Sequence, residues 1–221
     1  MPVLDYIIIL VAAYLLGSIP TGFLVAKAKG VDIRTVGSGN IGAMNAFRVL
    51  GKPAGIFVLL ADCAKGYVAC VGLAAVFVPT VYGAPGRILN ADQLEHTRIL
   101  AGIFAVLGHN FTCWLKFKGG KGIATTAGVY LALAPLAFAI AFAAFVLAVL
   151  VTRYVSVGAI AGAIVLPGTV WIMTPHNLFL SIVTTALGVL AIYKHKSNIQ
   201  RIMAGTENRL GKKSSTTEGA K

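Results

Sequence analysis

Charge is what this sequence has least of. Only 12% of its 221 residues are charged, roughly half the share of an average soluble domain. The hydrophobic residue types make up 57% of the chain. So little charge excludes an ordinary soluble domain and indicates an integral membrane protein. No polar stretch is long enough for a separate soluble domain, so residues 1–221 are expected to form a single transmembrane domain.

Cysteine is also scarce, and the three that occur do not form a pattern. Their number is odd and their spacing matches no metal site. Cys63 and Cys70 lie two helical turns apart, too far to form a disulfide. The first apolar run has no basic segment before it and no small-residue cleavage site, which argues against a removable signal peptide. The cysteines are therefore expected to be ordinary core residues.

The apolar runs are long enough to cross about 30 Å of hydrocarbon as helices. One region, from residue 122 to 152, is too long for a single upright helix, and Pro135 near its middle is expected to divide it. The fold class is then an all-α bundle of seven transmembrane helices. The predicted spans are about 3–26, 53–79, 98–115, 122–135, 136–152, 155–174 and 177–193.

The distribution of Lys and Arg supports seven spans over six. With seven spans and the N-terminus outside, every Lys and Arg faces the cytoplasm except Arg87, Arg98 and the intramembrane Lys65. Six spans would move Arg153 and the basic tail to the outer side, against the positive-inside rule. We therefore expect a cytoplasmic C-terminus and a flexible basic tail at 205–221.

The polar segments all fall on the predicted cytoplasmic face. The first reads VGSGNIGAMNAFR and contains a G-x-G-x-x-G match, but no β-strand precedes it, so a dinucleotide fold is excluded. It is either a flexible glycine loop or an anion-binding loop. In the second case backbone N–H groups would approach the anion, and side chains would add donors. Those side chains are Ser38, Asn40, Asn45 and Arg48.

A second glycine loop, FKGGKG at 117–122, is a stronger candidate for a phosphate site. Glycines around a lysine at a helix start combine exposed N–H groups, the positive helix end and a mobile ammonium. The alternative is a basic loop that only obeys the positive-inside rule, which is the expected role of Lys116 and Lys118. The residues that favour phosphate binding are Gly119, Gly120, Lys121 and Gly122.

Several other polar residues allow two interpretations each. Asp62 and Lys65, at helical i, i+3 spacing, are a buried ion pair, and Lys65 could in addition face an anionic substrate. His109 either caps backbone carbonyls or belongs to the site. Ser156 is a helix N-cap or a site residue. Glu207 is expected to support the tail.

His195 and Asn198 share one face of the helix that leaves the last span, because they are three residues apart. The neighbouring residues 199, 202 and 203 are apolar and could hold this segment against the mouth of the bundle. The alternative is a solvated tail, which the apolar stripe disfavours.

Carboxylates are nearly absent from the predicted cytoplasmic face. Neither a metal site nor a Ser-His-Asp set nor an acid pair for glycoside chemistry can be built there, so no metal or cofactor is predicted. The available groups are backbone N–H, Lys, Arg and at most a His as base. Any group that is transferred must therefore arrive already activated.

Five motifs, in order over nearly the whole chain, resemble the acyl-phosphate:glycerol-3-phosphate acyltransferase family of bacterial membranes. They are VGSGNIGAMNAFR, DCAKG, GHNFTCWLKFKGGKGIAT, YVS and HKSNIQRIMAGTE. The resemblance implies a seven-span enzyme of the inner membrane with its site on the cytoplasmic face. It would transfer a fatty acyl group from acyl phosphate to the 1-hydroxyl of sn-glycerol 3-phosphate, the first acylation of phospholipid synthesis. Membrane lipid is the expected surrounding, with no nucleic acid and no obligate protein partner.

The resemblance also implies where the site lies. It places Ser38, Gly39, Asn40 and Arg48 in the family's first motif, the glycine loop at 119–122 in glycerol 3-phosphate binding, and His195, Asn198 and Glu207 in the third motif. Lys65 and Ser156 match further site positions. The chain departs from the family where Met44 replaces a threonine, Ala64 a leucine and Thr112 a proline. Met44 could weaken one substrate contact, and the other two suggest packing variation.

Three chemical routes stay open from the residues. His195 or His109 could take the proton of the glycerol hydroxyl, the acyl phosphate could take it, or Ser38 could form an acyl-enzyme. Direct attack is favoured, with Ser38 and Asn40 as orienting groups. The alternative function is a transporter of a phosphorylated solute, which the lack of an internal repeat disfavours.

Overall fold

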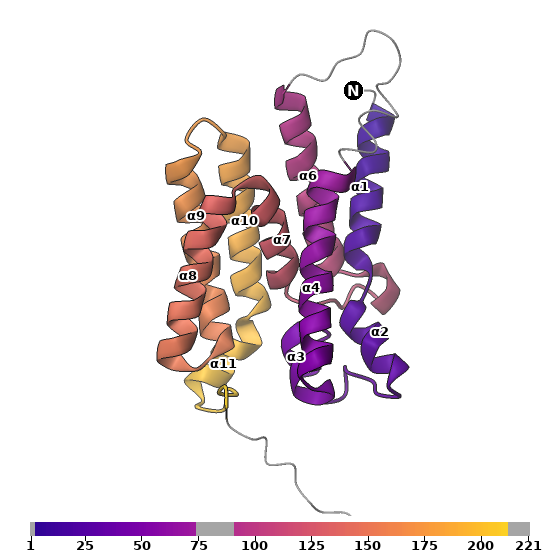
Figure 1. Ribbon diagram of the computed structural model, residues 1–221, viewed down its shortest axis with the longest axis vertical. Coiled ribbons are helices and arrows are strands. Elements are labelled where there is room, and N and C mark those ends of the chain that lie inside the picture. The colour runs from indigo at the N-terminus through magenta and orange to yellow at the C-terminus, as the bar shows by residue number, and fades with distance from the viewer. Residues whose placement is uncertain (1–2, 74–90, 212–221) are drawn as a thin grey trace, which may run out of the picture.

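The computed structural model describes residues 3–73 and 91–211, and within them every regular element is helical. The long helices stand side by side with roughly parallel axes (Figure 1). They are α1 (Val3–Ser18), α4 (Lys52–Val68), α6 (Ala91–Asn110), α7 (Ile123–Leu133), α8 (Pro135–Thr152), α9 (Val155–Met173) and α10 (Leu178–Lys194). A π-helical turn, η1 (Ala69–Leu73), continues α4, and a 3₁₀ turn, η2 (Cys113–Leu115), follows α6.

Three short helices gather at one end of the molecule, the lower end in Figure 1. They are α2 (Thr21–Ala28), α3 (Ala43–Leu50) and α11 (Lys196–Met203). The glycine-rich loop at 29–42 joins α2 to α3, and α11 follows α10 after a bend. The first glycine-rich loop and the segment HKSNIQR therefore lie at the same end of the bundle.

Five stretches of the described residues are long and apolar enough to span a membrane, namely Tyr6–Ala28, Lys52–Leu73, Ala91–Leu115, Pro135–Thr152 and Val155–Met173. The pair α10 and α11, bent by 50°, makes a sixth if it counts as one span. Helix α7, with 11 residues, is shorter than a span requires. The protein is thus an all-helical, multi-pass membrane protein, while the count of seven stays a prediction. Part of the predicted span 53–79 and of the predicted tail lies outside the described residues.

Close helix packing depends on glycines that face a neighbouring backbone. A Cβ atom at any of four glycines would come within 2.2 Å of a carbonyl oxygen on the partner helix. Gly17 and Gly108 do this between α1 and α6, and Gly66 and Gly128 between α4 and α7. Small residues that allow such approach are typical of membrane helix interfaces.

The first predicted span contains a break at Pro20 that the sequence analysis did not predict. Pro20 has no N–H to continue the helix, and carbonyl groups at the break take side-chain donors from elsewhere. Lys65 Nζ donates to Ile19 O at 3.0 Å and Thr112 Oγ1 donates to Ser18 O at 2.6 Å. The family that the chain resembles usually has a proline at this position, and a proline side chain could not make the bond that Thr112 makes.

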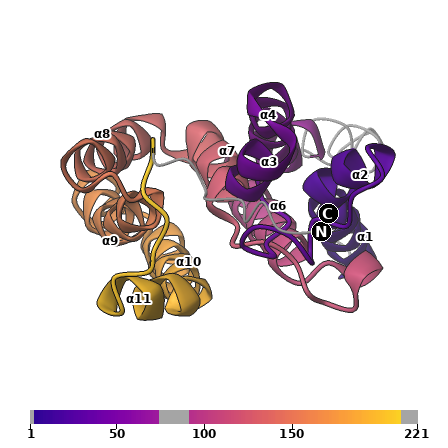
Figure 2. The same cartoon turned by 90° about the horizontal axis from the view of Figure 1, so that it is seen from below.

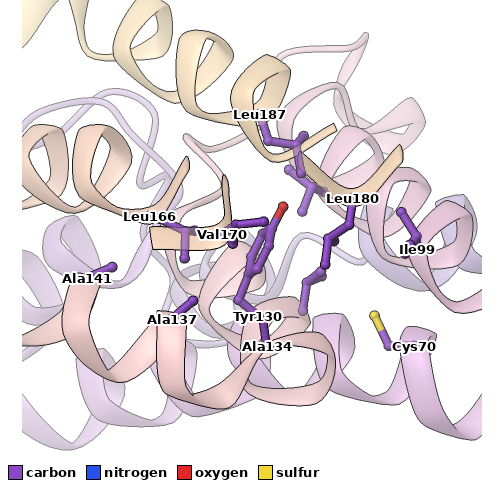
Figure 3. Close-up of a cluster of buried hydrophobic side chains, with 12 residues drawn as sticks. Cys70, Ile99, Tyr130, Ala134, Ala137, Ala141, Leu166, Val170, Leu180 and Leu187 are labelled. Atoms are coloured by element: carbon purple, nitrogen blue, oxygen red, sulfur yellow. The ribbon is translucent and has the colours of Figure 1, made fainter. Parts of the chain in front are cut away.

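Helix α7 lies between two groups of helices, with α1, α4 and α6 on one side and α8, α9 and α10 on the other (Figure 2). The largest core cluster includes residues from both groups. Its central aromatic, Tyr130 of α7, points toward α10 (Figure 3) and donates a 2.6 Å hydrogen bond to Thr184 Oγ1. This core holds α7, which follows the second glycine loop, against α10.

Candidate functional site

A chain of polar contacts connects the second glycine loop to the C-terminal segment. Lys121 Nζ donates a hydrogen bond to Asn198 Oδ1 of α11. Asn198 Nδ2 donates in turn to Glu207 Oε1 at 2.7 Å, and Ser156 Oγ at the start of α9 donates to the same oxygen at 2.8 Å. Residues from three separate motifs therefore meet at one place.

Glu207 is the centre of this cluster, although the sequence by itself predicts only that it supports the tail. Its second oxygen accepts a 2.7 Å charged hydrogen bond from Arg201 Nε. Partial burial alone would raise the pKa of Glu207, but the hydrogen bonds from Asn198, Arg201 and Ser156 outweigh it and lower the pKa. Glu207 is therefore a fixed anion that orients Asn198. In the sequence, only the place of Glu207 in the HKSNIQRIMAGTE motif indicates a role in the site, and the motif does not show which residues it contacts.

Burial lowers the pKa of Lys121, whereas it would raise that of Glu207. Desolvation, followed by the nearby positive charge of Arg201, lowers the pKa of the Lys121 ammonium to about 8, while Glu207 partly opposes the shift. A lysine in this state is a partly desolvated cation close to its titration point. Such a group binds an anion strongly because little water must be removed.

His195 lies at the junction of α10 and α11 and is buried, with 4% of its surface exposed. Its Nδ1 is 2.8 Å from the carbonyl oxygen of Ala191. Because a carbonyl oxygen only accepts, Nδ1 carries the proton and donates the hydrogen bond. Nε2 is then an acceptor, with no hydrogen-bond partner among the described residues. This is the tautomer that a general base requires.

The glycine loop itself is held against the last turn of α6. Gly119 N–H donates to Asn110 O at 3.2 Å and Gly120 N–H donates to His109 O at 3.0 Å. The prediction that this loop offers exposed N–H groups is therefore wrong for Gly119 and Gly120, because carbonyls of the helix end use them. Within the described residues, the N–H groups of Lys121 and Gly122 form no such bond.

Beneath the loop lies the buried ion pair that the sequence predicts. Lys65 Nζ is 2.9 Å from Asp62 Oδ1, and His109 Nδ1 is 3.7 Å from the same oxygen. All three side chains are buried. The interpretation of Asp62 and Lys65 as a buried ion pair is confirmed. Contact of Lys65 with a substrate stays a prediction.

The first glycine loop is organised by Asn45. Its Oδ1 accepts a 2.8 Å hydrogen bond from Ser38 N–H, and its Nδ2 donates to the carbonyl oxygens of Ile33 and Val36 at 3.1 and 3.0 Å. Because its amide donors are committed to the loop, the prediction that Asn45 supplies a donor to an anion is wrong. Asn45 shapes the loop instead.

The other three predicted site residues of this segment, Ser38, Asn40 and Arg48, are exposed or half-buried. Asn40 Oδ1 accepts from Gly42 N–H at 2.8 Å, as in an Asx turn, and Gly39 has a positive φ of 68°. Ser38 and Arg48 are exposed. No hydrogen bond joins Ser38, Asn40 or Arg48 to the Lys121 cluster within the described part of the chain. Direct contacts thus bring together three of the polar segments, namely the second glycine loop, the YVS turn and the HKSNIQRIMAGTE segment.

The cluster can bind a phosphoryl group and accept a proton. Lys121 supplies the cation, and His195, directly before α11, supplies the acceptor Nε2. Among the described residues, no group of three His, Cys, Asp or Glu is placed to hold a metal ion. The arrangement suits chemistry on a phosphorylated substrate.

Comparison with known protein families gives a match over most of the chain. The model of the glycerol-3-phosphate acyltransferase family matches residues 7–205. The glycerol-3-phosphate acyltransferase of Geobacter metallireducens is 47% identical over 206 residues, which cover 92% of this chain and 96% of the relative. That of Geotalea daltonii is 42% identical over 203 residues, covering 91% and 96%.

Solved structures give the same result. The chain resembles PlsY (YgiH), an integral membrane glycerol 3-phosphate acyltransferase, in its glycerol 3-phosphate form, with 34% identity and a TM-score of 0.80 over 93% of this chain and 96% of that one. The lysophosphatidic acid form of the same protein matches with a TM-score of 0.75 and 34% identity, over 93% and 95%.

Proposed function

The chain belongs to the glycerol-3-phosphate acyltransferase family, and we propose that it transfers a fatty acyl group from acyl phosphate to the 1-hydroxyl of sn-glycerol 3-phosphate. The products are lysophosphatidic acid and phosphate. The observation that carries this proposal is the cluster of Lys121, Asn198, Glu207 and Ser156 beside the free Nε2 of His195. The forms of PlsY that contain glycerol 3-phosphate and lysophosphatidic acid support the same substrate and product.

The reaction is a direct acyl transfer. The 1-hydroxyl oxygen attacks the carbonyl carbon of the acyl phosphate, and its proton passes to Nε2 of His195. The bond from the carbonyl carbon to the phosphate oxygen breaks, and phosphate leaves and takes up the proton. Acyl phosphate is a mixed anhydride, so the protein mainly aligns two phosphorylated molecules and screens their repulsion.

The residues divide this work by position. Lys121 and the free N–H groups of the second glycine loop hold the phosphate of glycerol 3-phosphate. Arg48, Ser38 and Asn40 bind and orient the phosphate of the acyl donor from the first loop, and Lys65 adds positive charge from within the bundle. Gly119 and Gly120 act through loop shape. The acyl chain lies among the helices, open to the bilayer.

The site faces the cytoplasm of a bacterial inner membrane in this proposal, with seven spans and the N-terminus outside. Exposed basic residues in the segments next to α2, α3 and α11 support this orientation, among them Arg34 and Arg209. Helix α7 would then be a short span that packs between the two groups of helices.

The test is product formation by purified protein in lipid with EDTA present, supplied with glycerol 3-phosphate and either palmitoyl phosphate or palmitoyl-CoA. We expect lysophosphatidic acid from palmitoyl phosphate alone. In Lys121→Ala, loss of a charged hydrogen bond of about 1.5–3 kcal/mol should raise the KM for glycerol 3-phosphate roughly 10- to 100-fold. Lys118→Ala, which removes an exposed lysine of the same loop, is the matched control and should change this KM less than about twofold.

Product from palmitoyl-CoA and none from palmitoyl phosphate would refute the proposed donor. Equal effects of the two lysine substitutions would refute the phosphate-binding role of Lys121.

A further inference from the structure

His109 fills the space between the ion pair and the second glycine loop. The residue lies in the last turn of α6 and is 6% exposed. Its Nδ1 is 3.7 Å from Asp62 Oδ1, and the same oxygen is 2.9 Å from Lys65 Nζ. One edge of the imidazole therefore faces a buried carboxylate whose position is set by α4.

The other edge of the imidazole lies directly against the loop. A Cβ atom built at Gly120 would be 2.1 Å from His109 Nε2, so the ring and the loop backbone are in contact with no room for a methyl group. The loop is also tied to the backbone of the same helix end by the bond from Gly120 N–H to His109 O, 3.0 Å long. The position of the ring and the position of the loop are thus linked.

We propose that His109 is a positioning residue for glycerol 3-phosphate: the imidazole is packed between the Asp62 carboxylate and the second glycine loop, and it fixes the backbone from Gly119 to Lys121. The inference rests on the proposed function. Because Lys121 follows Gly120 directly, a shift of the loop moves the backbone from which the ammonium reaches Asn198 and the phosphate. A misplacement of about 1 Å in a site of this kind can cost orders of magnitude in rate.

This role predicts a selective effect. The contacts of His109 lead to Asp62 and to the glycine loop, whereas the first loop and its side chains are held by Asn45. Removal of the imidazole should therefore weaken binding of glycerol 3-phosphate and leave the KM for the acyl donor nearly unchanged. A purely structural role would lower Tm and affect both substrates.

The experiment is a double-mutant cycle between the ring and the loop. His109→Ala lets the loop move into the space of the missing imidazole, and Gly120→Ala pushes the loop away from the ring. In the double variant, the new methyl group of residue 120 occupies space that the imidazole has left. We expect each single substitution to raise the KM and the Kd for glycerol 3-phosphate on the order of tenfold, and the double variant to bind at least threefold better than Gly120→Ala.

Gly119 provides the matched control. A Cβ atom there would meet the backbone carbonyl oxygen of His109 at 2.0 Å, and this atom is still present in His109→Ala. Gly119→Ala should therefore weaken binding by itself, and His109→Ala should not rescue it. Rescue at residue 120 without rescue at residue 119 supports contact between the ring and the loop.

Binding of glycerol 3-phosphate is measured by calorimetric titration of protein in nanodiscs, alongside KM, kcat and Tm. An unchanged Kd in His109→Ala, equal increases in the KM for both substrates, or no rescue in the double variant would overturn the inference. Wild-type protein that binds glycerol 3-phosphate but forms no lysophosphatidic acid would refute the proposed reaction only, because the titrations still decide the role of His109.

Discussion

At the scale of single residues, the site depends on which polar groups are free and which are committed. Asn45, at the start of α3 beside the first glycine-rich loop, carries amide donors, and Lys121, in the second loop, carries ammonium donors. Asn45 uses its donors on carbonyls of its own loop, whereas Lys121 reaches across to Asn198 in α11. Sequence motifs find such residues but do not show the acceptors, which depend on loop conformation. Lys121 and Asn198, which the sequence assigns to the site from separate motifs, are in contact, and their part in substrate binding stays a prediction. The prediction of Asn45 as a donor to an anion is wrong.

Lys121 should make substrate binding depend on pH. Its pKa is lowered to about 8 by burial, so the charged fraction falls as pH rises through that value. The KM for glycerol 3-phosphate should be constant near pH 7 and rise several-fold between pH 8 and pH 9. In Lys121→Arg the rise should be absent, because a guanidinium stays protonated there. Steady-state kinetics of both proteins from pH 6.5 to 9.5 check this, and a flat wild-type profile would exclude Lys121 as the titrating group.

At the scale of helices, prolines and glycines decide how elements end and how closely they pack. Helix α7 ends at Leu133 and α8 begins at Pro135, where the sequence places a break. Pro20 also breaks a helix, although the predicted span runs through it, while Pro167 lies inside the continuous helix α9. At Pro20 the interruption leaves the carbonyls of Ser18 and Ile19 to side-chain donors, namely Thr112 and Lys65. These neighbours are distant in sequence, so single-sequence patterns cannot identify them.

The glycine contacts between α4 and α7 lead to a stability prediction. Gly128→Ala would place a methyl group 1.9 Å from the carbonyl oxygen of Cys63, so the helices must separate. We expect a loss of about 1–3 kcal/mol and a Tm in detergent lower by several degrees. Gly168→Ala in α9 is the control, because its added Cβ would meet no described atom within 4 Å apart from the adjoining backbone of its own helix. If the Tm of Gly128→Ala is as high as that of Gly168→Ala, α4 and α7 are not in close contact.

At the scale of the whole molecule, the short polar helices and the basic loops share one end of the bundle (Figure 1). The sequence could predict this because hydropathy places the loops and the positive-inside rule assigns their side. It could not predict that α7 lies between the two helix groups, since that position depends on Gly66, Gly128 and Tyr130 contacts with partners far along the chain. The site forms where loops carried by both groups meet.

The proposed orientation predicts opposite accessibility at the two ends of α6. Asp92 lies exposed at its start, and Lys118 lies exposed in the loop beyond its end. In a protein whose three cysteines are replaced by serine or alanine, Asp92→Cys should react with a membrane-impermeant maleimide in intact spheroplasts. Lys118→Cys should react only after the membrane is opened, because a span of about 30 Å of hydrocarbon separates it from the reagent. Labelling of Lys118→Cys in intact spheroplasts, with Asp92→Cys protected, would place the site outside the cell. That result would contradict the reaction as proposed, because the negative charges of its two phosphorylated substrates keep them on the side where they are made.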